Sequence, residues 1–166
     1  MAIVAFDWRR ATPDDVPLLA ALYRDAALRL GPRVYTPEQT RAWASFAEDE
    51  DGFRRYVLEA DTWIAARLGD GRPLGFCGVG RTGALREVHS LYVTPARTRQ
   101  GIGGEMLRRG LERAMAEGAT RFAAWATPFS RPVFLAAGFV EAQVVTAPFA
   151  GVLFQRHRLE RYFGNL

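Results

Sequence analysis

The 166-residue sequence predicts a mixed α/β (α+β) fold: a mostly antiparallel sheet with one central parallel β-α-β unit and helices on both faces. A strand-like segment over 87–93, a helical segment over 101–117 and an apolar strand over 120–126 follow one another, and this order closes as a right-handed parallel crossover. The other strand-like segments are joined by short turns, which is typical of antiparallel pairs. No linker interrupts the chain, so residues 1–166 are expected to form a single domain.

The first elements are a short strand, FDWRRAT from Phe6 onward, and a helix over 12–31. Thr12 and Asp15 have the spacing of a capping box, and Gly31 stops the helical pattern. The residues expected on the buried stripe of this helix are Leu18, Leu19, Leu22 and Ala26.

A second helix is predicted over 36–46, because Thr36 and Gln39 repeat the capping-box spacing. The acidic run EDED over 48–51 is expected to be a solvated loop. Outside the central unit, the remaining predicted segments are strands at 62–68 and 73–81, a short helix at 131–138, and a hairpin of strands at 139–148 and 151–160.

The helix over 101–117 is predicted to be amphipathic and to end at Gly118. Its apolar face carries Ile102, Met106, Leu107, Leu111 and Ala114. Its polar face carries Arg108, Arg109, Glu112 and Arg113.

Composition limits the classes of partner. The net charge is +4, yet all 22 basic residues are scattered arginines, so no nucleic acid partner is expected. No apolar run approaches the ~18 residues of a membrane span, so no membrane partner is expected. Cys77 is the only cysteine and the first residues are too short for a secretory signal, which favours a cytoplasmic location. No His or Cys cluster has metal-ligand spacing, so no metal is expected.

The stretch TRQGIGGEMLRR, residues 98–109, places three glycines at the start of the amphipathic helix. Glycines there let an anion approach unpaired backbone N–H groups, so a phosphate site is one interpretation and tight helix–strand packing is the other. A dinucleotide fingerprint would need glycine at Met106, and a Walker loop would need lysine, which the chain lacks.

The ordered set EVHSLYVTPARTRQGIGGEMLRRGLERA, a following strand and then FLAAGF resembles the GCN5-related N-acetyltransferase (GNAT) superfamily over residues 86–139. The resemblance implies a GNAT-like sheet whose two central strands splay apart, acetyl-CoA as cosubstrate, and an N-acetyltransferase, a kind of acyltransferase, that acts on a primary amine. A small-molecule or a peptide amine is the implied acceptor partner.

The resemblance also implies which residues contact the cofactor. The diphosphate would be held by the main chain of Arg99, Gln100, Gly101, Ile102, Gly103 and Gly104. The pantetheine arm would follow Leu91, Tyr92 and Val93. Thr127 stands where the family has asparagine, and Phe134 stands where many members have the tyrosine that protonates the thiolate.

Phe134 cannot donate a proton, so the catalytic groups must be found elsewhere. Glu87 and His89 are the candidates for the base that receives the amine proton, and a period of two places them on one face unless a bulge intervenes. Tyr92 is a candidate for the missing acid. The alternative interpretations are a surface glutamate paired with arginine, a satisfied histidine and a packing tyrosine.

Tyr35 and Trp43 lie in the predicted N-terminal helical region, which in this superfamily shapes the acceptor pocket, so both are candidates for substrate binding. They are otherwise core aromatics. Because of Phe134, a non-catalytic acyl-CoA-binding regulatory module with the same fold is the alternative function. The sequence leaves the acceptor and the oligomeric state open, and a homodimer is compatible with it.

Overall fold

The structure is a computed structural model that describes residues 4–164. The strands are β1 (Phe6–Arg10), β2 (Asp61–Arg67), β3 (Pro73–Val79), β4 (Leu85–Val93), β5 (Arg121–Ala126), β6 (Val140–Phe149) and β7 (Val152–Tyr162). The α-helices are α1 (Val16–Leu30), α2 (Pro37–Ser45), α3 (Glu50–Leu58), α4 (Ile102–Ala116) and α5 (Arg131–Ala136). Short 3-10 turns lie at Pro13–Asp15, Gly31–Arg33, Phe46–Glu48 and Pro95–Arg97.

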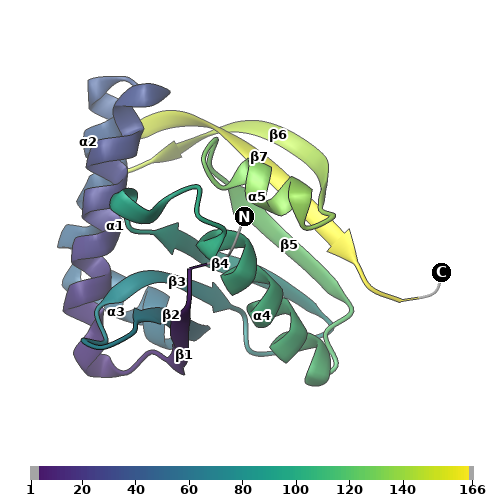
Figure 1. Ribbon diagram of the computed structural model, residues 1–166. Helices are drawn as coiled ribbons and strands as arrows, with labels where there is room; N and C mark the ends of the chain where they lie inside the picture. The colour runs from purple at the N-terminus through teal and green to yellow at the C-terminus, as the bar shows by residue number, and fades with distance from the viewer. Residues whose placement is uncertain (1–3, 165–166) are drawn as a thin grey trace.

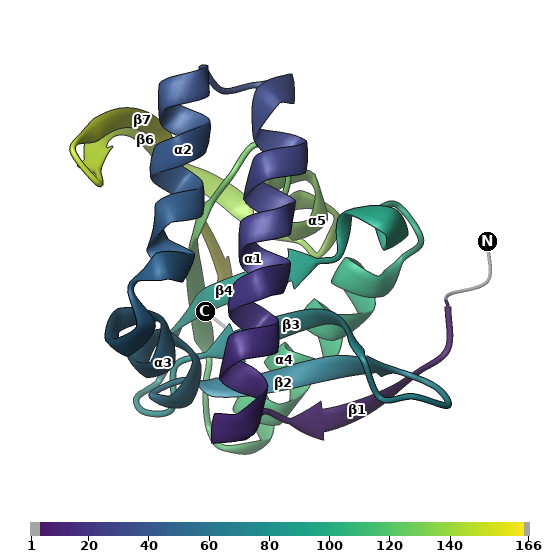
Figure 2. The ribbon, with the colours of Figure 1, turned by 90° about the vertical axis from the view of Figure 1, so that its left-hand side faces the viewer.

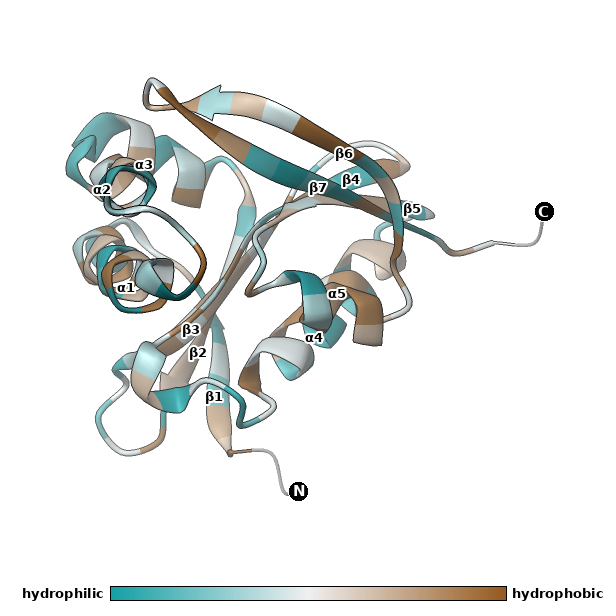
Figure 3. Cartoon of the chain, turned by 90° about the horizontal axis from the view of Figure 1, so that it is seen from above, coloured by the Kyte–Doolittle hydropathy of each residue, from teal (hydrophilic) through white to brown (hydrophobic). Residues whose placement is uncertain are grey.

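Within these residues a seven-stranded sheet has the order β1-β2-β3-β4-β5-β7-β6 (Figure 1). Every neighbouring pair is antiparallel except β4 and β5, which are parallel. The helices α1, α2 and α3 cover one face of the sheet, and α4 and α5 cover the other (Figures 2 and 3). The predicted fold class is therefore confirmed.

Each face of the sheet has its own hydrophobic core, because successive strand residues point to opposite faces. Ile64 and Phe76 pack with α1, α2 and α3, whereas Ala65 and Cys77 pack with α4 and α5. The predicted apolar face of α4 is confirmed as buried: Ile102, Met106, Leu107, Leu111 and Ala114 are each at most 3% exposed. None of the described helices is both long and apolar enough to span a lipid bilayer.

The two helix starts predicted from capping boxes are present. Gln39 donates its N–H to Thr36 Oγ1 at 3.1 Å, and Thr36 donates its N–H to Gln39 Oε1 at 3.0 Å. At the start of α1, the N–H of Thr12 donates to Asp15 Oδ2 at 2.8 Å. The Arg9 guanidinium binds both oxygens of Asp15 at 2.8 Å, which ties β1 to the helix that carries Tyr23 toward the candidate site.

Two predictions for this region are wrong. The run 48–51 is not a loop: Asp49 caps α3 by accepting the N–H of Gly52 at 3.0 Å, and acidic residues in the first turn complement the helix dipole. In α1, Leu18 is 55% exposed, whereas the other predicted stripe residues are buried and Tyr23 joins them.

Asp15 is expected to make stability depend on pH. The Arg9 hydrogen bonds lower the pKa of Asp15 to about 2 from 3.8, so the charged carboxylate stabilises the folded state. This contribution, about 2 kcal/mol, is complete above about pH 5 and is lost as pH falls toward 2. Asp15→Asn should therefore lower the free energy of unfolding by about 2 kcal/mol at pH 7 and by much less near pH 2.5. Urea unfolding at several pH values measures this, with the exposed neighbour Asp14→Asn as control. An equal loss at every pH would contradict the assignment.

Candidate active site

The parallel pairing of β4 with β5 is short. It runs from the pair Leu85–Arg121 to the pair Glu87–Ala123 and then stops, although β4 stays paired with β3 as far as Val93. A cavity of about 40 Å³ lies between the diverging strands. Its lining residues are Val88, His89, Ser90, Leu91, Tyr92, Trp125, Thr127, Ser130 and Phe134.

A β-bulge at His89 accompanies this divergence. Gly78 lies opposite Ser90 and Val79 lies opposite Val88, so His89 has no opposite residue on β3. A bulge bends its strand and raises the local twist, which turns β4 away from β5. The hydroxyl of Tyr56 donates to the His89 carbonyl at 2.9 Å, so the irregular backbone keeps a hydrogen-bond partner.

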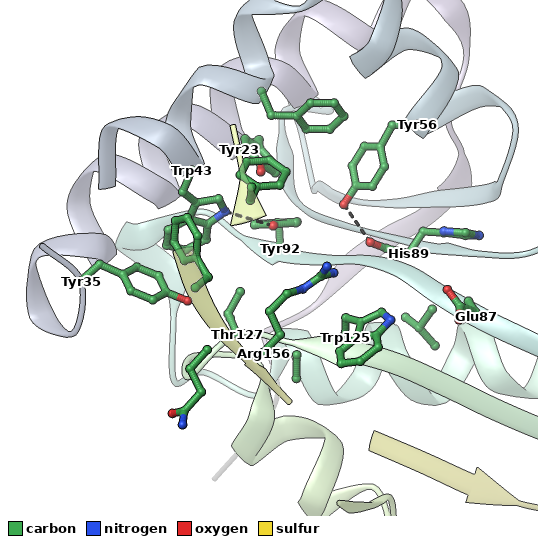
Figure 4. Close-up of a pocket in the computed structure, with 16 residues that line it drawn as sticks. Tyr23, Tyr35, Trp43, Tyr56, Glu87, His89, Tyr92, Trp125, Thr127 and Arg156 are labelled. Atoms are coloured by element: carbon green, nitrogen blue, oxygen red, sulfur yellow. Dashed lines mark hydrogen bonds between the residues drawn. The ribbon is translucent and has the colours of Figure 1, made fainter. Parts of the chain in front are cut away.

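Glu87 and His89 both line the larger pocket described below, but they differ in exposure. Glu87 is half-buried, whereas His89 is exposed, and Figure 4 shows the imidazole directed away from Tyr92. The carboxylate of Glu87 accepts a hydrogen bond from Arg158 Nη1 through Oε1 at 2.6 Å. Among residues 4–164, no hydrogen bond to Glu87 Oε2 is recorded, so this oxygen is open to another donor.

Beyond the bulge, β4 presents backbone amides to the gap. Thr94 donates its N–H to the Leu74 carbonyl of β3 at 2.7 Å. Because N–H groups alternate in direction along a strand, those of Leu91 and Val93 point toward β5, which has separated from β4 there. Leu91, Tyr92 and Val93 thus form the open edge of the strand.

The glycine-rich turn before α4 is built around two left-handed residues. Arg99 has a φ of 62° and Gly101, which caps α4, has a φ of 81°. No hydrogen bond within residues 4–164 is donated by the backbone N–H groups from Thr98 to Gly104; the first recorded one is from Glu105 to the Gly101 carbonyl. Arg99, Gln100, Gly101, Ile102, Gly103 and Gly104 therefore bring a row of free amides to the positive end of the helix dipole.

The charges around this turn are partly balanced. Arg108 and Arg109 both bind Glu105 Oε1, at 2.7 Å and 2.8 Å. The Arg108 hydrogen bond lowers the pKa of Glu105 to about 2, so this carboxylate stays charged and offsets them. Arg97 and Arg99 make no ion pair within the described chain and supply the unbalanced positive charge at the turn.

A larger pocket of about 300 Å³ opens beside the gap (Figure 4). Its lining residues are Tyr23, Tyr35, Trp43, Phe46, Tyr56, Glu87, Val88, His89, Tyr92, Trp125, Ala126, Thr127, Phe149, Phe154, Gln155 and Arg156. Trp125, Thr127 and Tyr92 also line the small cavity, so the two spaces adjoin. The candidates Tyr35 and Trp43 both lie in this wall, with ring centroids 5.6 Å apart.

Tyr92 lies where the pocket meets the gap. Its hydroxyl accepts a hydrogen bond from Trp43 Nε1 at 3.4 Å, and its ring stacks on Phe76 at 5.4 Å. Burial raises the pKa of Tyr92, and burial also raises the pKa of Tyr35, to about 12. These side chains therefore remain protonated hydroxyls at neutral pH.

The position of the missing tyrosine is apolar. Phe134 is 2% exposed, packs on Phe139 with ring centroids 5.0 Å apart, and lines the small cavity. Thr127 and Ser130 bond to each other reciprocally: the N–H of Thr127 donates to Ser130 Oγ at 3.0 Å, and the N–H of Ser130 donates to Thr127 Oγ1 at 3.1 Å. Ser130 thus brings a hydroxyl to the gap.

Two pocket residues, Tyr56 and Arg156, and the partner of Glu87, Arg158, carry no sequence signal. Tyr56 comes from α3, a helix that the sequence analysis missed, and Arg156 and Arg158 come from β7. The sequence marks the arginines only as members of an alternating strand. Their convergence on Trp125 and Glu87 depends on the pairing of β7 with β5, which places Arg158 opposite Trp125.

Splayed central strands, a turn of free amides at a helix start and an adjoining pocket are the features that the resemblance to N-acetyltransferases predicts. The family described as the acetyltransferase (GNAT) domain matches residues 32–161, so the chain belongs to the GNAT acetyltransferase family. This confirms the resemblance and, at the level of the family, the prediction of an N-acetyltransferase.

Known proteins agree with this assignment. The GCN5-related N-acetyltransferase from Rhodopseudomonas palustris has a TM-score of 0.87 at 26% identity, over 98% of this chain and 99% of that one. The PaiA N-acetyltransferase from Thermoplasma acidophilum, solved with coenzyme A, has a TM-score of 0.73 at 15% identity, over 96% and 100%. YafP from Escherichia coli (strain K12), an uncharacterized N-acetyltransferase, is 27% identical over 100 residues, and the match spans 60% of this chain and 61% of YafP.

Tyr56→Phe is expected to lower the free energy of unfolding by about 1 kcal/mol, because it removes the hydrogen bond to the His89 carbonyl at the bulge. Tyr35→Phe is the matched control, because the Tyr35 hydroxyl makes no hydrogen bond to residues 4–164. Removing this hydroxyl should change the free energy of unfolding by only about 0.3 kcal/mol. Chemical denaturation of the two variants measures the difference. Equal effects would show that the bulge does not depend on Tyr56.

Proposed function

We propose that this protein transfers the acetyl group of acetyl-CoA directly to a primary amine. The observation that carries the proposal is the row of free amides from Thr98 to Gly104, near the gap between β4 and β5. The side chains of Arg97, just before this row, and of Arg99, within it, add positive charge. Such a helix start suits a diphosphate, and the adjacent strand edge suits the amides of a pantetheine arm. The fold is shared with proteins solved with coenzyme A or acetyl-CoA.

In this proposal the amine nitrogen bonds to the thioester carbon, the C–S bond breaks, and CoA leaves as the thiolate. The N–H groups of Leu91 and Val93 face the place where charge develops on the carbonyl oxygen and would stabilise it. Glu87, through its free Oε2, receives the amine proton directly or through one water. Tyr92 is the hydroxyl proposed to protonate the thiolate, because Phe134 cannot.

A non-catalytic acyl-CoA-binding module is the second candidate, favoured by the buried phenylalanine at position 134. The two functions differ in one measurement. An enzyme releases free CoA thiol when amines are added to the acetyl-CoA complex, whereas a binding module holds acetyl-CoA without release.

Gly101→Ala is expected to weaken acetyl-CoA binding about 10-fold or more, because a Cβ at a φ of 81° strains the turn and moves its amides. Gly71→Ala is the matched control: Gly71 has a φ of 70° in the β2–β3 turn, outside the glycine-rich turn, and nothing lies within 4 Å of its Cβ position, so the substitution causes similar backbone strain. Isothermal titration of both variants measures the affinity. Unchanged affinity in Gly101→Ala would contradict the diphosphate assignment.

Glu87→Gln is expected to lower kcat/KM about 100-fold near pH 7 and to leave acetyl-CoA affinity within about twofold, since a base is needed only while the amine is protonated. The loss should shrink as pH rises toward the pKa of the amine. His89→Ala, at an exposed position, should have a small effect. Thiol-release assays across pH measure both variants. A larger loss in His89→Ala would transfer the role of base to His89.

A further inference from the structure

The pocket holds a guanidinium that has no hydrogen-bond or ion-pair partner among residues 4–164. Arg156, on β7, is half-buried and lines the pocket, and Figure 4 shows its guanidinium extended toward Tyr92. The cation lies 4.9 Å from the ring centroid of Trp125, which holds it in place. No hydrogen bond or ion pair from Arg156 to residues 4–164 is recorded.

Arg158 shows the contrast on the same strand. It also lies against Trp125, at 5.3 Å, but it is paired with Glu87 at 2.6 Å and with Glu160 at 3.5 Å. Within the described chain, most arginines without a carboxylate partner are exposed and can be hydrated. Arg97, Arg156 and Arg161 are half-buried and have none; Arg161 donates to the Ala137 carbonyl, and Arg97 lies beside the proposed diphosphate turn.

A shielded guanidinium is stabilised by a carboxylate, which it can bind through two parallel hydrogen bonds. Within residues 4–164 no carboxylate pairs with Arg156, so an anionic group on the ligand would complement it. The rest of the wall is aromatic, with Trp43, Phe149 and Phe154 among its members, and this surface accepts an apolar body. A volume of about 300 Å³ suits a small molecule.

We propose, on the basis of the proposed acetyl transfer, that the acceptor is a free amino acid with a large apolar side chain. Its amine faces Glu87 and the gap between β4 and β5, its carboxylate binds Arg156, and its side chain packs against the aromatic wall. A protein N-terminus fits less well, because the α-carboxyl group of its first residue forms a peptide bond and carries no charge to pair with Arg156.

Three amines that share the phenylethylamine group test this: phenylalanine, phenylalaninamide and phenethylamine. Leucine and methionine are added to vary the side chain. The free amino acids should have kcat/KM values at least about 10-fold above those of the amide and the plain amine, because only they bind the guanidinium. The assay is thiol release from acetyl-CoA, with mass spectrometry to confirm the acetylated amine.

Arg156→Met keeps the length of the side chain and removes the charge. It should lower kcat/KM for phenylalanine about 10- to 100-fold, mainly by raising KM, and leave phenethylamine within about twofold. Arg156→Lys should restore part of the loss. Arg41→Met removes an exposed charge on α2, outside the pocket, and should have no effect on any of the amines.

The outcomes separate this inference from the proposed function. If acetyl-CoA neither binds nor raises the melting temperature, acetyl transfer itself fails. If acetyl-CoA binds but the amide and phenethylamine react as well as phenylalanine, or no free amino acid reacts, the amino-acid acceptor is wrong. An equal effect of Arg156→Met on all amines would likewise overturn the role given to Arg156.

Discussion

The separation of β4 from β5 beyond Glu87 is the constraint on which the rest of the site depends. The closed end is held firmly: Arg86, 5% exposed, donates to Glu117 Oε2 at 2.7 Å and to the Gly83 carbonyl at 3.2 Å, linking the start of β4 to the end of α4. The core beneath α4 joins Cys77 on one side of the gap to Phe122 on the other. Closing the gap would require both the bulge and this core to rearrange. The N–H groups of Leu91 and Val93 therefore have no partner on β5, and such a group costs about 1–3 kcal/mol when it is buried unpaired.

The placement of paired and unpaired arginines separates structural from functional charge. On α4, Glu105 offsets Arg108 and Arg109, and in the pocket Glu87 pairs with Arg158. Among the arginines of residues 4–164 that pair with no carboxylate, Arg97 and Arg99 lie at the glycine-rich turn and Arg156 lies on β7 beside Trp125. A chain whose basic residues are all arginine gives little information through composition alone. The ion pairs show where positive charge is balanced within the fold and where it faces a space that a ligand could occupy.

The sequence predicted well what depends on neighbours along the chain. The capping box of Thr36 and Gln39, the apolar face of α4 and the parallel unit all have signals confined to one segment or to consecutive elements. The helix α3 was missed because its cap at Asp49 lies in a run of acidic residues that resembles a loop. Arg156 and Tyr56 could not be predicted as site residues, since their positions depend on the sheet order and on a bulge in another strand. Glu87 and His89 line one pocket, but a period of two does not reveal their different exposure.

The aromatic wall connects the binding of the acceptor to the chemistry proposed for it. Protein interiors are close-packed, so a space of about 300 Å³ is too large to be a packing defect of the core. Its aromatic rings come from α1, α2, α3, β4, β5 and the β6–β7 hairpin. The rings limit water, which raises the pKa of Tyr92 and strengthens any attraction between Arg156 and an anion. They also disfavour a protonated amine, so the same surroundings that retain the acceptor would promote transfer of its proton to Glu87. Binding and deprotonation would then have one physical origin, the low polarity of a pocket that opens directly onto the gap between the strands.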